Sequence, residues 1–171
     1  MQGYYMEVYE AIQKRKSIRK FRPEPVPDET ATKILRAGTQ APNAFNKEQW
    51  EFILIKDREL QNAIAQTRAR IPPQRIALET APLILVVCYE NELGVDGMAS
   101  AYTCIENILL AATAEGLGSV TLTSRGSKIK EMLNIPEGYD VAAIMPIGYP
   151  DEEPEKPVRV PVERKIHINR F

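Results

Sequence analysis

The segment from Met98 to Glu115 is the strongest helical signal in the chain, and it constrains the fold more than any other stretch. Its apolar side chains recur at helical spacing and make a broad face, formed by Ala101, Ile105, Ile108, Leu109 and Ala112. A helix with so wide an apolar face needs cover over much of its surface, so we expect it to lie centrally and largely buried. Gly116 and Gly118 tolerate positive φ and predict where the helix ends.

Shorter patterns on either side of this helix predict an irregular alternation of helices and strands. The mostly apolar segment from Trp50 to Ile55 predicts a buried strand. A second helix is expected to start after an N-cap at Asp28 and to end no later than Ala41. Ile71-Pro72-Pro73 is expected to end a helix over residues 60–70. Further helices are expected over 6–16, 75–79 and 127–133. Further strands are expected over 83–89, 120–123 and 141–147.

This alternation fits either a doubly wound parallel sheet or a mixed α+β layer structure. Gly116-Leu117-Gly118 follows a helix, which reverses the dinucleotide-binding order, and no predicted strand leads into a glycine-rich phosphate loop. We therefore reject a nucleotide-binding Rossmann fold and expect an α+β fold.

Composition points to one globular domain. The chain has 171 residues, of which 44% are hydrophobic and 26% charged. A net charge of −1 argues against a general nucleic-acid or membrane-surface binder. Cys88 and Cys104 stand in apolar contexts without CxxC spacing, as reduced core residues of a cytosolic protein do. The start of the chain lacks a signal-peptide core and the apolar runs are too short to span a bilayer, so we expect a soluble, cytoplasmic protein.

Proline and charge dominate residues 151–171, which hold few side chains able to make a core of their own. Such a tail is either disordered or lies on another surface. Its aliphatic side chains favour the second option; they are Val158, Val160, Val162 and Ile166. We expect a single domain over 1–171, with 151–171 extending over a partner subunit.

A cluster of cations without any acid lies between Gln13 and Arg22. Arg15, Lys16 and Arg19 flank the hydroxyl of Ser17 within one short turn. Paired guanidinium donors, an ammonium and a hydroxyl suit a dianionic phosphate on a small ligand. The alternatives are a basic helix end that complements the helix dipole, or a stray nucleic-acid patch.

Three other stretches have side chains or backbone suited to a ligand. The amides of Asn43, Asn46 and Gln49 suit the polar edge of a heterocycle, although an ordinary helix-to-strand loop explains them as well. Residues 116–124 allow close approach of backbone N–H groups, or form a simple helix end. Lys156 and Arg159 suit a second arm on the same phosphate, or a solvated tail.

In their order along the chain, these stretches resemble the motifs of the FMN-dependent nitroreductase family. Residues 15–21, RKSIRKF, resemble its RRSIRxF opening, and residues 41–50, APNAFNKEQW, resemble its AP-S-x-x-N-x-Q-P-W loop. Residues 109–119 are similar to its LLLAA-x-x-x-GLGS segment, and residues 148–170 to its GYP…KPR-x-P tail. The chain departs from the pattern at Lys16, which replaces an arginine, at Asn43, which replaces a serine, and before Trp50, where a proline is missing.

The resemblance implies a nitroreductase-like mixed sheet flanked by helices, in an intertwined homodimer with FMN sites at the interface. It implies NAD(P)H-dependent two-electron reduction, through FMN, of a small-molecule acceptor such as a nitroaromatic or quinone. The net charge argues against a nucleic-acid or membrane partner, and a single histidine with two cysteines outside CxxC spacing argues against a metal site. The choice between NADH and NADPH stays open. Because the cofactor performs the hydride chemistry, no catalytic residue is assigned.

The same resemblance implies which residues hold the cofactor. The phosphate and ribityl chain would be held by Arg15, Lys16, Ser17 and Arg19, with Arg159 approaching from the tail. A flavin held mainly by the partner subunit would be reached by Pro42, Asn43, Ala44 and Asn46. Backbone N–H groups of Thr123 and Ser124 would face the N5 edge of the flavin.

Two alternatives stay open at this point. One is a family member with different flavin chemistry, either flavin destruction or reductive dehalogenation. The other is a non-catalytic flavin- or nucleotide-binding module, such as a store or sensor. Reduction of a bound flavin by NADH or NADPH, followed by reoxidation with an acceptor, separates an enzyme from such a module.

Overall fold

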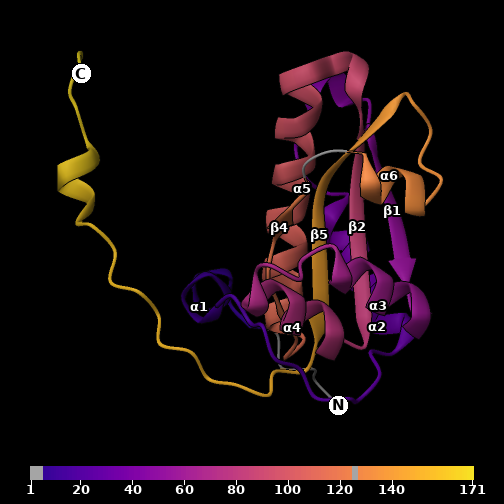
Figure 1. The fold of residues 1–171 in the computed structure, drawn as a ribbon. Coiled ribbons are helices and arrows are strands. Elements are labelled where there is room, and N and C mark those ends of the chain that lie inside the picture. Colours follow the sequence, from indigo (N-terminus) through magenta and orange to yellow (C-terminus); the bar gives the residue numbers. More distant parts are fainter. Residues whose placement is uncertain (1–5, 125–126) are drawn as a thin grey trace.

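A five-stranded sheet forms the middle of the molecule, and helices cover both of its faces (Figure 1). The computed structural model describes residues 6–124 and 127–171. The strands follow the order β1–β2–β5–β3, and β4 pairs with β5 beside this path. Their bounds are Trp50–Ile55 (β1), Leu83–Glu90 (β2), Gly118–Ser119 (β3), Leu122–Thr123 (β4) and Tyr139–Gly148 (β5).

The named strands all pair in the antiparallel sense. Within the described residues, the one parallel pairing is an isolated bridge between Ser17 and Ser119. The prediction of an α+β fold is therefore confirmed, and the doubly wound parallel sheet is excluded.

The central strand β2 shows why the sheet needs cover on both faces. Its alternate residues enter two different cores, as the two-residue repeat of a strand requires. Leu83, Leu85 and Val87 belong to the core beneath α5, while Ile84 and Val86 belong to the core on the opposite face. An uninterrupted apolar run therefore marks a strand that is buried on both sides.

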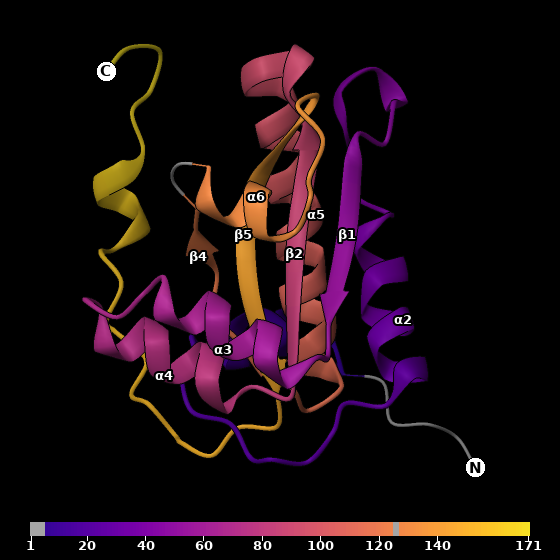
Figure 2. The ribbon, with the colours of Figure 1, turned by 45° about the vertical axis from the view of Figure 1, so that its right-hand side comes forward.

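Helix α5 (Gly94–Ala114) lies along one face of the sheet, with α2 (Asp28–Gly38) packed beside it (Figure 2). The predicted apolar face of α5 is buried, which confirms its central position. Helix α2 approaches α5 closely at Gly38, where an added Cβ would lie 2.6 Å from Cγ1 of Ile108. A larger residue at position 38 would push the two helices apart.

Helices α3 (Arg58–Gln66), α4 (Pro72–Thr80) and α6 (Lys128–Met132) cover the other face (Figure 2). Ile71-Pro72-Pro73 was expected to end the preceding helix. Instead, Pro72 opens α4, since proline at the first helical position loses no intrahelical hydrogen bond. The preceding helix had already ended at Gln66.

Other boundaries differ from the expectations by a few residues. Strand β1 is a sheet edge on which Trp50 and Ile55 are buried and Glu51 and Leu54 are exposed, so the prediction of a buried strand was wrong for the middle of β1. Helix α2 takes Pro27 as its N-cap and begins at Asp28 itself. The first helix, α1, is short (Val8–Lys14). Of the strand expected over 120–123, only residues 122–123 form a strand, β4, and the separate strand β3 lies just before it.

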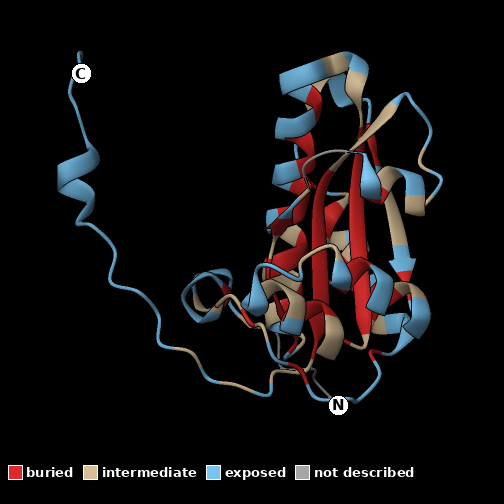
Figure 3. Cartoon of the chain, viewed as in Figure 1, coloured by how far each residue is buried: buried red, intermediate tan, exposed pale blue. Residues whose placement is uncertain are grey.

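The tail leaves the body of the molecule after its first residues (Figure 3). From 155 to 171 its residues are exposed, including the 3-10 turn η3 (Val162–Lys165). The aliphatic side chains of the tail are therefore largely exposed in the single chain, and their placement on a partner subunit stays a prediction. Within the described residues, no helix is both long enough and apolar enough to cross a membrane.

Candidate functional site

The residues from Arg15 to Arg19 form an extended segment that is attached to the end of the sheet. Helix α1 stops at Lys14, and Arg15 already has extended dihedral angles. The backbone N–H of Ile18 then donates to the carbonyl of Ser119 over 3.0 Å, next to the bridge between Ser17 and Ser119. Because successive side chains point to opposite sides, Ile18 enters the core and Ser17 and Arg19 face outward.

The cation cluster and the tail enclose a cavity of about 190 Å³. Five of the predicted cofactor-binding residues line it, namely Arg15, Lys16, Ser17, Arg19 and Arg159. Arg159 thus comes from the same chain as the cluster, although more than a hundred residues separate them in the sequence. With Lys156, five cationic residues and the hydroxyl of Ser17 line this small cavity, and Glu155 lines it as well. The cations and the hydroxyl are the donor set that a phosphate requires.

Lys156, the other cation expected in the tail arm, lines the same cavity but is also bonded to helix α1. Its ammonium donates to the carbonyl oxygens of Ile12 at 3.1 Å and Gln13 at 2.5 Å. These carbonyls belong to the last turn of α1, where a cation is favourable. Lys156 lines the cavity and also fastens the tail to α1, which brings Arg159 to the cluster.

Acidic side chains of the tail partly neutralise the cluster. Lys16 forms an ion pair with Glu153, and the backbone N–H of Arg19 donates to Oε1 of Glu152 at 2.5 Å. Lys20 pairs with Asp151 at 3.0 Å. The cluster is free of acids in the local sequence, but the fold supplies acids from the tail.

The second predicted set of residues lies in a separate place. Pro42, Asn43 and Ala44 line a cavity of about 300 Å³ next to the first half of α5. Asn46 follows them in the turn η1 (Ala44–Asn46). The carboxamide oxygen of Asn43 accepts from the backbone N–H of Glu48 at 2.8 Å, so it holds the loop's own shape.

The strand register shows that the two sets lie at opposite ends of the sheet. The loop joins β1 at Trp50, which is level with Tyr89 on β2 and Asp140 on β5. The cation cluster is joined to Ser119, which is level with Ile147 on β5. Seven residues of strand separate these two levels, a distance of roughly 23 Å.

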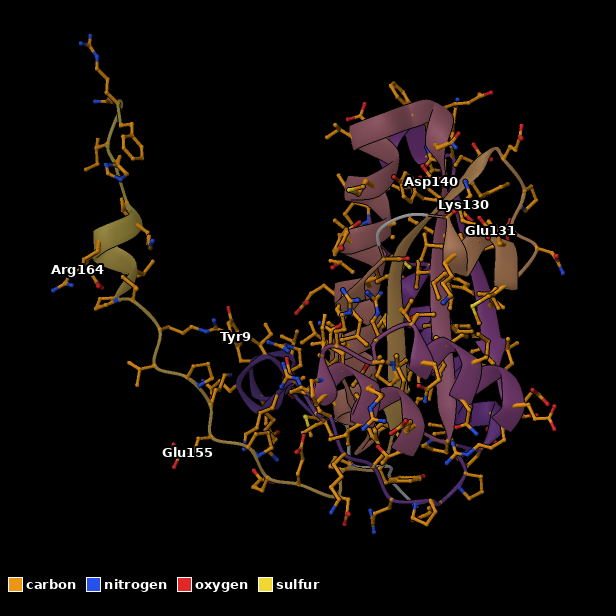
Figure 4. The ribbon with its side chains drawn as sticks, viewed as in Figure 1. Tyr9, Lys130, Glu131, Asp140, Glu155 and Arg164 are labelled. Carbon is orange, nitrogen blue, oxygen red and sulfur yellow. The ribbon has the colours of Figure 1, made fainter. Side chains whose placement is uncertain are left out.

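Figure 4 shows the same separation. Asp140 lies at the upper end of β5, while Glu155 lies in the first part of the tail, at the lower left and below α1. One chain therefore does not bring Asn43 and Asn46 to its own cation cluster.

Thr123 and Ser124 lie between the two ends. Thr123 pairs with Ala143, four residues along β5 from the level of Ser119, or about 13 Å. A ligand that reaches from Arg15 and Ser17 to the Thr123 backbone must be elongated.

Arg68 is a candidate site residue that the sequence analysis did not identify. Its Nη2 donates to the carbonyl of Thr123 at 2.8 Å, and burial lowers the pKa of the guanidinium. Its Nε is buried without a hydrogen-bond partner among the described residues, as is Oγ of Ser119 beside Ser17. An arginine at the end of an amphipathic helix is an ordinary solvated charge in sequence terms, so only the fold reveals it.

Comparisons with known proteins agree over nearly the whole chain. The family model described as "Nitroreductase family" matches residues 12–149. A protein of Methanothermobacter thermautotrophicus, provisionally named NADH dehydrogenase/NAD(P)H nitroreductase, is 34% identical over 157 residues, or 87% of this chain and 80% of that protein. The structure of the NADPH:FMN oxidoreductase of Vibrio harveyi complexed with NAD+ has a TM-score of 0.87 at 28% identity, covering 96% of this chain and 77% of that one.

A third similar protein has a different activity. The structure of oxidised iodotyrosine deiodinase, bound to FMN and 3-iodo-L-tyrosine, has a TM-score of 0.85 at 25% identity. The match covers 96% of this chain and 100% of that chain. The same fold thus occurs in proteins that are named for different acceptors.

Proposed function

The chain belongs to the nitroreductase family, and we propose that it binds FMN along the sheet edge from Arg15 to Ser124. It is a flavin-dependent oxidoreductase that passes electrons from NAD(P)H to a small organic acceptor. When bound, FMN would supply the two-electron hydride chemistry between NAD(P)H and the acceptor. The residues of this chain bind and orient the cofactor and exclude water.

The observation that carries this proposal is the cavity between the cation cluster and the tail. Arg15, Lys16, Arg19 and Arg159 meet there around the hydroxyl of Ser17. They would hold the dianionic phosphate, for which bidentate guanidinium groups are the best partners in proteins. A bound phosphate would compete with the carboxylate of Glu153 for Lys16.

The rest of the cofactor would extend toward β4. The buried Oγ of Ser119 has no hydrogen-bond partner among the described residues and lies beside Ser17, at the level of the cation cluster, where a polyol can supply the missing partner. Backbone N–H groups of Thr123 and Ser124 would face the N5 edge of the flavin. Arg68, which bonds to the Thr123 carbonyl, would add positive charge near the ring system.

The loop of Pro42, Asn43, Ala44 and Asn46 would complete the site of the other subunit in a homodimer. The separation of roughly 23 Å along the sheet supports this arrangement, because the loop does not reach its own cluster. The exposed aliphatic residues of the tail support it as well, since they are available to a partner. The cytoplasmic location stays a prediction, based on the two free, buried cysteines.

The expected reaction balances for both acceptor classes. A quinone gains two electrons and two protons, one hydride from NAD(P)H and one proton from water, and becomes a hydroquinone. A nitroaromatic gains the same, loses water and becomes a nitroso compound. Each turnover releases one NAD(P)+.

Reductive dehalogenation is a second candidate, favoured by the likeness to the deiodinase that binds 3-iodo-L-tyrosine. The short segment before α5 indicates an open acceptor site, which favours the first candidate over dehalogenation. The turn η2 (Asn91–Leu93) leads directly into α5 at Gly94, so the described residues place no additional helix there. An open site suits varied planar acceptors more than one amino-acid substrate.

A flavin reduction assay tests the proposal. The purified protein is expected to be yellow, to lose its flavin absorbance anaerobically with NADH or NADPH, and to regain it with a quinone or nitroaromatic. A yellow protein that is inert to both nucleotides would contradict the enzyme. A colourless protein that does not bind added FMN would contradict the flavin site, and faster reoxidation by 3-iodo-L-tyrosine than by quinones would favour dehalogenation.

A further inference from the structure

The loop between Asn43 and Gln49 has a backbone conformation that its sequence does not favour. Phe45, Asn46 and Glu48 all have positive φ, at 56°, 52° and 52°. Asparagine tolerates this left-handed region, whereas a phenylalanine is an outlier there because its Cβ crowds the backbone. Strain of this kind persists where the surroundings hold it, and it gathers at functional positions.

The surroundings of Phe45 do hold the loop on both sides. Before it, the backbone N–H of Ala44 donates to Oγ of Ser100 at 3.0 Å, and Oγ1 of Thr103 donates to the carbonyl of Pro42 at 2.9 Å. After it, the buried Gln49 donates through Nε2 to the carbonyl of Ala44 at 3.0 Å. The backbone of the loop is therefore anchored to α5 and to the start of β1.

Packing in the chain does not explain the strained phenylalanine. The side chain of Phe45 is 75% exposed and belongs to neither core. The Nζ of Lys47 lies over its ring, 5.9 Å from the centroid. The loop thus presents outward an aromatic ring and an ammonium group at the same place.

We propose that Phe45 and Lys47 form the wall against which a planar aromatic acceptor stacks in the partner subunit's flavin site. The inference rests on the proposed function, which brings Asn43 and Asn46 of this same loop to that site. The ring of Phe45 offers a face for offset stacking, and the ammonium of Lys47 attracts the negatively polarised oxygens of a quinone or nitro group. Phe45 is then a specificity-determining residue that favours planar acceptors over non-planar ones.

Substitutions at position 45 separate the effect of the aromatic ring from the effects of side-chain size and backbone strain. Phe45→Leu keeps an apolar side chain without a ring, and Phe45→Tyr keeps the ring. Phe45→Gly relieves the positive φ, because glycine adopts it freely. Each purified variant, with the substitution in every chain, is assayed for flavin content and for the rate of flavin reduction by NAD(P)H. Its steady-state KM is measured with menadione, 4-nitrobenzoate and ferricyanide.

The expected result is a change confined to aromatic acceptors. Phe45→Leu and Phe45→Gly should raise KM for menadione and 4-nitrobenzoate about three- to tenfold, the value of one aromatic pair. They should leave KM for ferricyanide, flavin content and flavin reduction unchanged, and Phe45→Tyr should behave like the original protein. Phe45→Gly should also raise the thermal midpoint, because glycine removes the strain of the positive φ and the exposed ring contributes little to stability.

Other outcomes would overturn the inference. Unchanged KM values for the aromatic acceptors, an equal rise for ferricyanide, or a rise confined to NAD(P)H would each exclude acceptor stacking on Phe45. A lower thermal midpoint for Phe45→Gly would assign the residue to the fold. If the unsubstituted protein bound no FMN or was not reduced by NAD(P)H, the proposed function itself would fail, which is a separate result.

Discussion

Ile18 lies so close to Gly118 that a Cβ added to the glycine would be 2.6 Å from Cγ1 of Ile18. Gly118 does not need unusual dihedral angles, so the requirement at this position is space. The contact joins the segment that carries Ser17 and Arg19 to the end of the sheet. The geometry of the proposed phosphate site therefore depends on the absence of a side chain at residue 118.

We expect Gly118→Ala to weaken FMN binding and to destabilise the protein together. The methyl group would push Ile18 from its buried position and shift the backbone bond from Ile18 to Ser119. Overpacking of this kind costs about 1–3 kcal/mol. Urea denaturation and flavin titration measure the two effects.

Gly138→Ala is the matched control, since a Cβ there meets nothing within 4 Å. It should change neither the free energy of unfolding nor the flavin affinity by a comparable amount. Equal effects of both substitutions would show that the close contact at Gly118 is unimportant.

The second prediction concerns the contribution of Arg15 and Arg19 to FMN affinity. Arg15→Ala and Arg19→Ala should each lower FMN affinity about ten- to hundredfold, because a lost charged hydrogen bond costs about 1.5–3 kcal/mol. Both side chains lie at the surface cavity, outside the two cores, so the thermal midpoint should change little. Fluorescence titration with FMN checks the affinity, and unchanged dissociation constants in both variants would place the phosphate elsewhere.

How far the sequence predicts this site depends on how local the signal is. Arg15, Ser17 and Arg19 lie within one short turn of the sequence. The uninterrupted apolar run of β2 indicates a strand that is buried on both faces of the sheet. Their positions follow from short-range chemistry. The resemblance to family motifs then joined stretches that local reasoning left separate.

The features that were missed depend on contacts between distant residues. Glu152 and Glu153 neutralise the cluster only because the tail returns along residues 16–22, and Arg68 meets Thr123 across the fold. Similarly, the edge position of β1 depends on which strands pair, which its own side chains do not encode. Such pairings follow from the packing of the whole chain.

The third prediction concerns Glu153, which competes with the ligand for Lys16. Glu153→Gln removes this ion pair and should tighten FMN binding about two- to fivefold. The expected effect is small because the Glu153 side chain is 87% exposed and solvent screens the pair. Flavin titrations at low and high salt measure it, with Glu163→Gln as a control at an exposed residue of η3 that does not line the cavity.

A weaker affinity for FMN in Glu153→Gln would show that the carboxylate supports the site instead of competing for it. The difference between the variants should shrink as salt rises, since screening weakens the original pair.

The fourth prediction follows from the buried thiols. Burial raises the pKa of Cys88 to about 11, with a smaller contribution from Glu51, and raises the pKa of Cys104 to about 12. In the unfolded chain both thiols ionise near the ordinary value of about 8.5. Because the folded pKa values are the higher ones, this contribution to stability is full below pH 8.5 and is lost as the pH rises through the folded values.

Urea denaturation between pH 8 and 11 should therefore show a falling free energy of unfolding, by up to about 1.4 kcal/mol per pH unit for each thiol. Cys104→Ala should make the decline shallower while lowering stability at pH 8 through the small cavity it creates. The same slope in the variant and the original protein would show that Cys104 does not contribute.

The last prediction is that one flavin site needs two chains. The cluster around Arg15 and the loop around Asn43 lie roughly 23 Å apart along the sheet, so lesions in them should complement each other between subunits. One chain carries Arg15→Ala and Arg19→Ala, and the other carries Asn43→Trp and Asn46→Trp, each with its own affinity tag. Neither homodimer should hold FMN well. In the heterodimer both lesions fall in one site, and the other site is intact, so half the normal flavin content should return. FMN that binds only the dimer must also stabilise the dimer by mass action. A verified heterodimer without recovery of flavin, or a monomer that binds FMN tightly, would instead show that each site is built within one chain.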